Sequence, residues 1–90
     1  MGDAIFKFKI MPTSPDVNLD ELEEAAKKVV EEQQGRGTKI EREPIAFGLV
    51  AVIVIFLRDE KLEQEVLEKA MQAIPNVSSA EIIDFRRAFG

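Results

Sequence analysis

The segment LVAVIVIFL, residues 49–57, decides the fold, because none of its side chains is polar. A strand with one face in water alternates polar and apolar residues, whereas a strand covered on both faces does not. Counted from Gly48, the apolar run is about ten residues long, and a membrane-spanning helix needs roughly 20. We therefore predict a central strand of a sheet, with both faces covered or with an open face that is used.

A first strand is predicted in residues 4–11. Its residues alternate, so that Phe6 and Phe8 share one face while Lys7 and Lys9 lie on the other. Such a pattern is typical of a strand with one buried face. The two aromatic side chains are expected to point into a core.

A helix is predicted in residues 19–34. Asn18 or Asp16 is expected to cap its first turn, and Gly35 and Gly37 are expected to end it. Apolar side chains recur at spacings of three and four, which gives one buried stripe made of Leu19, Leu22, Ala26, Val29 and Val30.

Two further elements flank the central segment. Residues 38–43 are compatible with a strand but mostly charged, which favours an edge strand protected against pairing with other chains. After a charged turn in residues 58–61, a second helix is predicted over residues 60–73, with an apolar stripe made of Leu62, Val66, Leu67, Ala70 and Ile74.

The final segment, VSSAEIIDFRRAF in residues 77–89, is predicted to be a strand. Simple alternation would place Ile83 and Phe85 on one side, and Asp84 and Arg86 on the other. The order of elements is then β-α-β-β-α-β.

This order predicts an α+β fold of the ferredoxin-like class, with a four-stranded antiparallel sheet and two helices on one face. The first and third strands are central in that topology, which agrees with the apolar character of residues 49–57. A chain of 90 residues is expected to form a single domain, residues 1–90.

Charge and composition exclude several classes of partner. The formal net charge is -5 and the pI is near 4.7, so the protein as a whole repels nucleic acid and anionic lipid and attracts basic partners. We expect no direct nucleic-acid partner and no membrane partner. With no Cys and no leader pattern, the expected location is the cytoplasm. We also expect the protein to be a monomer.

Catalysis by side chains has little support in the sequence. The chain has no His and no Cys, and its Ser residues (Ser14, Ser78 and Ser79) therefore lack the usual activating base. Gly35 and Gly37 end a helix instead of opening one, which disfavours a phosphate-binding loop. We predict no catalytic residue, no metal site and no cofactor, so the protein is not expected to be an enzyme.

The stretch PIAFG, residues 44–48, is the most unusual feature that remains. Phe47 sits between Ala46 and Gly48, in a turn where polar residues are common. Its ring could contact a partner, or it could cap the end of the core. Arg86 and Arg87 form a second feature, either a positive site for a partner or a solvated end of the chain.

Three stretches together resemble the archaeal translation elongation factor 1-beta family: residues 1–23, the PIAFG turn, and the ending D-x-RR within residues 77–89. The resemblance implies a guanine-nucleotide exchange factor for the GTPase elongation factor 1-alpha, in its GDP-bound and nucleotide-free forms. It also implies that the hairpin aromatic, here Phe47, binds the second domain of the GTPase. A basic side chain near the C-terminus, here Arg87 or Arg86, would disturb the Mg²⁺ and phosphate site.

Other functions remain open for a fold of this class. The main alternative is a regulatory or small-ligand-binding module that acts as a homodimer. An acylphosphatase-like enzyme would need an Arg beside Asn18, which the sequence lacks. An RNA-recognition domain would need a basic surface and aromatic residues on its open sheet face.

Overall fold

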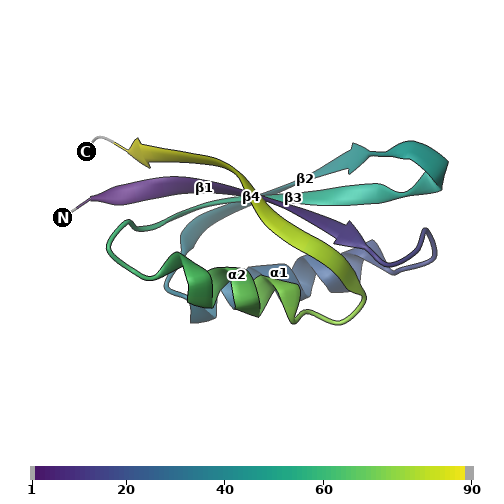
Figure 1. Ribbon diagram of the computed structural model, residues 1–90, viewed down its shortest axis with the longest axis horizontal. Coiled ribbons are helices and arrows are strands. Elements are labelled where there is room, and N and C mark those ends of the chain that lie inside the picture. The colour runs from purple at the N-terminus through teal and green to yellow at the C-terminus, as the bar shows by residue number, and fades with distance from the viewer. Residues whose placement is uncertain (1, 89–90) are drawn as a thin grey trace.

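The computed structural model describes residues 2–88, which form four strands and two helices in two layers (Figure 1). All strand pairs are antiparallel, the sheet order is β2-β3-β1-β4, and both helices cover one face. The elements are β1 (Asp3–Pro12), α1 (Leu19–Glu32), β2 (Arg36–Pro44), the short 3₁₀ helix η1 (Ala46–Gly48), β3 (Val50–Asp59), α2 (Gln64–Gln72) and β4 (Val77–Ala88). The predicted ferredoxin-like topology is confirmed.

Strand β3 occupies the central position expected for residues 49–57. Its side chains Val52, Val54 and Phe56 face the helices and are buried. On the open face, Ala51 and Ile53 are also buried; Ile53 lies between Lys9 of β1 and Glu41 of β2, and Ala51 lies opposite Glu43 of β2. Both faces of the segment are therefore covered at these positions, as its composition predicted.

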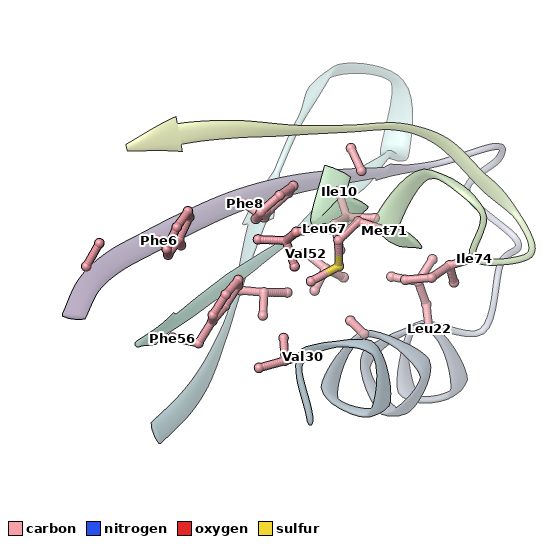
Figure 2. Close-up of a cluster of buried hydrophobic side chains, with 14 residues drawn as sticks. Phe6, Phe8, Ile10, Leu22, Val30, Val52, Phe56, Leu67, Met71 and Ile74 are labelled. Atoms are coloured by element: carbon pink, nitrogen blue, oxygen red, sulfur yellow. The ribbon is translucent and has the colours of Figure 1, made fainter. Parts of the chain in front are cut away.

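The core lies between the sheet and the helices, and aromatic rings form one end of it (Figure 2). The rings of Phe6 and Phe56 stack at a centroid distance of 5.5 Å, and Phe8 stacks on Phe56 at 6.0 Å. Leu67 and Met71 of α2 fill the space over the sheet beyond these rings. The alternating pattern of residues 4–11 thus placed its aromatic residues correctly.

Helix α1 begins where the sequence indicated and ends two residues earlier, at Glu32. The side chain of Asn18 accepts a hydrogen bond from the Glu21 N–H at 3.2 Å, so Asn18 is the cap. After the helix, the residue in the left-handed conformation is Gln34, with φ 67°. Gly35 is needed for space instead, since a Cβ there would lie 2.5 Å from Val30 Cγ1.

The prediction for residues 58–63 was wrong. Strand β3 continues to Asp59, and Arg58 is buried with 3% of its surface exposed, not part of a surface turn. The Asp59 carboxylate and carbonyl accept hydrogen bonds from the N–H groups of Lys61 and Leu62, which closes a turn after the strand. Helix α2 consequently begins at Gln64, four residues later than expected.

The side-chain alternation predicted for β4 was wrong at Ile83, whereas Asp84 and Arg86 do share the face opposite to Phe85. Phe8 pairs with Ile82 and Lys7 pairs with Asp84, so Ile83 is an extra residue in a β-bulge. The bulge moves Phe85 opposite Phe6 on the helix side, where the two rings meet edge to face at 5.0 Å. Ile83 lies on the other face, and Phe89 of the predicted strand lies outside the described residues.

Candidate partner-binding site

The turn between β2 and β3 has a defined backbone structure. The Ile45 N–H donates a hydrogen bond to the Leu49 carbonyl at 2.7 Å, and the Leu49 N–H donates one to the Ala46 carbonyl at 3.3 Å. Phe47 has φ 63° and ψ 31°, and Gly48 has φ 76°. Two consecutive left-handed residues let the chain reverse within five residues, and glycine adopts that conformation without strain.

Phe47 is the most exposed large apolar side chain among the described residues, at 93%. Ala46 and Gly48 on either side of it are exposed as well. The interpretation of Phe47 as a cap on the core is therefore wrong, because the ring does not touch the core at all. The turn presents an unpartnered aromatic ring between two small residues.

Arg86 and Arg87 lie at the opposite end of the molecule from this turn (Figure 1). The molecule is elongated, with extents of 42 × 20 × 18 Å, and the arginines pair with Ile5 and Ala4 at the beginning of β1. Because neighbouring strand residues alternate, Arg86 lies on the open face of the sheet and Arg87 on the helix side. The structure does not bring the two groups of predicted site residues together.

Each arginine has a carboxylate partner. Arg86 Nε lies 3.1 Å from Asp84 Oδ2, and Arg87 Nε lies 3.2 Å from Glu60 Oε2. Both arginine side chains are nevertheless about three-quarters exposed. They can therefore exchange these partners for groups on another molecule at low cost.

No enclosed ligand site accompanies these residues within the part of the chain that the structure describes. A hollow of about 150 Å³ lies beside the start of α1 and is lined mainly by apolar groups, including Leu22 and Ile74. Among residues 2–88, acidic side chains form no cluster of three that could hold a metal ion. Neither helix of this region is long and apolar enough to cross a membrane.

Two charged residues were not recognised as important from the sequence. Arg58 donates hydrogen bonds to the carbonyls of Gln33 and Glu63, at 2.7 and 3.2 Å, and so ties the end of α1 to the start of α2. Burial lowers the pKa of the Arg58 guanidinium, and the nearby Asp59 carboxylate partly offsets that effect. Arg42 joins β2 to α1 and is described below.

An exposed aromatic turn at one end of the sheet and two exposed arginines at the other are typical of a surface that binds another protein. The chain belongs to the EF-1 guanine nucleotide exchange domain family, whose sequence model matches residues 5–88. It is therefore a translation factor that promotes guanine-nucleotide exchange on elongation factor 1-alpha, and not an enzyme.

Several curated relatives support this assignment. Elongation factor 1-beta of Pyrococcus horikoshii is 56% identical over 77 residues, which is 82% of each chain. The factor of Methanothermobacter thermautotrophicus is 43% identical over 91 aligned positions, covering 97% of this chain and 98% of the relative. The factor of Methanobrevibacter smithii is 46% identical over 88, with the same coverage.

Solved structures confirm the fold. The 30S ribosomal protein S6 of Thermotoga maritima superposes with a TM-score of 0.67 at 24% identity, covering 97% of this chain and 89% of that chain. A regulator of polyketide synthase expression from Bifidobacterium adolescentis superposes with a TM-score of 0.64 at 16% identity, covering 98% of this chain and 34% of that chain. At these identities the similarity concerns the fold alone.

Proposed function

We propose that this chain accelerates GDP release by binding elongation factor 1-alpha through two separate sites. It acts as a monomer, and residues 1–90 form one exchange domain. Phe47, flanked by Ala46 and Gly48, binds one domain of the GTPase. Arg87 or Arg86 acts at the Mg²⁺ and phosphate site. The observation that carries the proposal is the 93% exposure of Phe47 in a left-handed turn.

The conformation of Phe47 supports a functional role for its ring. A left-handed backbone costs a residue with a side chain about 1–2 kcal/mol compared with glycine. An exposed ring gains nothing from the fold in return, so the fold alone favours glycine or asparagine at this position. Strained residues of this kind are concentrated at binding and catalytic sites.

A phenylalanine that becomes buried in a partner can carry much of the binding free energy. Truncation of such an anchor to alanine typically costs about 2 kcal/mol or more. Here the turn is already hydrogen bonded in the free protein, so little conformational freedom of the backbone is lost when the ring binds.

The distant arginines suit a second contact. Exchange requires no nucleophile or proton donor, only contacts that favour the nucleotide-free conformation of the GTPase over the GDP-bound one. A guanidinium placed where Mg²⁺ is held would repel the metal and bind the freed carboxylates and phosphates. Contacts at both ends of a body 42 Å long would also let the factor separate two parts of its partner.

The remaining features of the proposal concern location and other partners. The acidic net charge of -5 supports a protein partner over nucleic acid. Action on a translation GTPase supports a cytoplasmic location. The family assignment leaves no support for a homodimeric ligand-binding module, and sedimentation of the isolated protein tests whether it is a monomer.

The proposal is tested by release of labelled GDP from purified elongation factor 1-alpha at several Mg²⁺ concentrations, with and without this protein. Acceleration is expected, together with a loss of about 30-fold or more in affinity for Phe47→Ala, as the 2 kcal/mol of a hot spot implies. The matched control is Val66→Ala, which shortens an apolar side chain of α2 that is 48% exposed. This variant is expected to leave the affinity for elongation factor 1-alpha unchanged. Failure to accelerate release at any Mg²⁺ concentration would disprove the function, and equal effects of the two variants would disprove the role of Phe47.

A further inference from the structure

The hairpin that carries Phe47 extends beyond the four-stranded part of the sheet. Strand β3 pairs with β1 only as far as Val52, opposite Ile10, whereas its pairing with β2 continues to Val50, opposite Pro44. We call residues 43–51 the hairpin tip. A two-stranded hairpin is only marginally stable by itself, so the direction of the hairpin tip depends on side-chain contacts at its base.

Arg42 makes the main contact at that base. It lies opposite Val52, in the last row of the sheet that includes β1. Its side chain crosses to α1, where Nη2 donates a hydrogen bond to Asp20 Oδ1 at 2.8 Å and Nε donates one to Glu23 Oε2 at 2.6 Å. Hydrogen bonding with Glu23, more than the weaker effect of Asp20, raises the pKa of the guanidinium.

The geometry of this bridge suits an arginine better than a lysine. Asp20 and Glu23 are three residues apart and therefore lie on one face of α1. A planar guanidinium can donate to both carboxylates at once in a fixed orientation, whereas the ammonium of a lysine acts as a point charge. Glu23 is also the more buried partner, with 17% of its side chain exposed against 87% for Asp20.

One further contact holds the hairpin tip. Glu43, the residue after Arg42, lies on the opposite face of the sheet, where its Oε2 is 3.6 Å from Lys9 Nζ. The tip is thus held from the helix side by Arg42 and from the open face by Glu43.

We propose that Arg42, through Asp20 and Glu23, is a positioning residue that fixes the direction in which Phe47 is presented to elongation factor 1-alpha. This inference rests on the proposed role of Phe47 as an anchor. Arg42 itself need not touch the GTPase. The hydrogen bonds of Arg42 to Asp20 and Glu23 restrict the motion of the hairpin tip in the free protein, so that less conformational entropy is lost when the complex forms.

The first test is exchange kinetics with Arg42→Ala. The concentration of this protein that gives half the maximal exchange rate is expected to rise about 3- to 10-fold, while the maximal rate at saturation stays within about twofold. Compared with Arg42→Ala, Arg42→Lys is expected to restore only part of the affinity, because lysine keeps the positive charge but lacks the planar set of N–H donors of a guanidinium. The charge-matched control is Lys69→Ala, which breaks an exposed ion pair on α2 and is expected to leave the half-saturating concentration unchanged.

A double variant separates positioning from a direct contact. If Arg42 acts through Phe47, then Arg42→Ala adds little to the defect of Phe47→Ala, whereas independent contacts would add fully. In the isolated protein, NMR order parameters of the Phe47 and Leu49 amides should fall in Arg42→Ala and stay unchanged in Lys69→Ala. If Arg42→Ala does not fold, Glu23→Gln replaces it, because this variant removes the charge of the carboxylate that accepts the hydrogen bond from Arg42 Nε. The same exchange kinetics and order parameters are then measured.

The outcomes distinguish this inference from the proposed function. Full additivity of the two substitutions, or unchanged half-saturation in both Arg42→Ala and Glu23→Gln, would overturn the positioning role while leaving Phe47 as an anchor. A normal affinity of Phe47→Ala would overturn the anchor and, with it, the role of Arg42.

Discussion

Glu60 neutralises Arg87 in the free protein, and removing its charge is expected to speed nucleotide exchange if Arg87 is the residue that acts on the partner. The carboxylate of Glu60 is 3.2 Å from Arg87 Nε, and 27% of its side chain is exposed, against 73% for Arg87. To reach the metal site of the GTPase, Arg87 must first leave this carboxylate. Glu60→Gln keeps the shape of the side chain and removes the competition.

The size of the effect follows from the exposure of the pair. An ion pair open to solvent contributes about 0–1 kcal/mol, and 1.4 kcal/mol corresponds to a factor of ten. Glu60→Gln should therefore accelerate exchange at limiting factor concentration by at most about fivefold. The difference should disappear at high salt, which screens the pair in the parent protein.

The assay is release of labelled GDP from elongation factor 1-alpha at factor concentrations well below half-saturation. Asp84→Asn is measured in parallel, because Asp84 holds Arg86 in the same way at 3.1 Å. The variant that accelerates exchange identifies the acting arginine. Glu65→Gln, which breaks the exposed pair with Lys69, controls for the change in net charge, and the reasoning fails if neither test variant is faster than this control.

Two further predictions concern stability. Gly35→Ala should lower the free energy of unfolding by about 1–3 kcal/mol in urea titrations, because the new methyl group would lie 2.5 Å from Val30 Cγ1; an unchanged midpoint would show that α1 can move away. Arg58→Ala should cost about 2–4 kcal/mol in the same assay, since it leaves a cavity and unpairs the carbonyls of Gln33 and Glu63. Arg58→Lys should recover less than half of that loss, because a compact ammonium does not reproduce the spacing of Nε and Nη2, which reach the two carbonyls separately; full recovery would show that only the charge matters.

The fold could be predicted from the sequence because its main determinants are local. The uninterrupted apolar run of residues 49–57 indicated the central strand, and the alternation of Phe6 and Phe8 indicated which face of β1 is buried. The bulge at Ile83 could not be predicted, since it depends on the register between β4 and β1. Neither could the burial of Arg58, whose two acceptors come from segments 25 and 5 residues away.

The candidate site was predicted unevenly for the same reason. Phe47 was proposed from the sequence because an aromatic residue next to Gly48, in a turn that begins at Pro44, contradicts the usual composition of a turn. Arg42 was not, because in the sequence it is one charge among several on an edge strand. Its partners are 22 and 19 residues earlier in the chain, and only the packing of α1 against β2 brings them within reach.

The left-handed conformation of Phe47 has a consequence for protein engineering. A redesign that optimises thermostability alone would replace this residue by glycine, which relieves the backbone and removes an apolar group from solvent. If Phe47 is the anchor proposed above, the product would be more stable but would bind elongation factor 1-alpha weakly. Position 47 should therefore be kept constant in any stabilisation effort, and the gains should be sought in the helix layer instead.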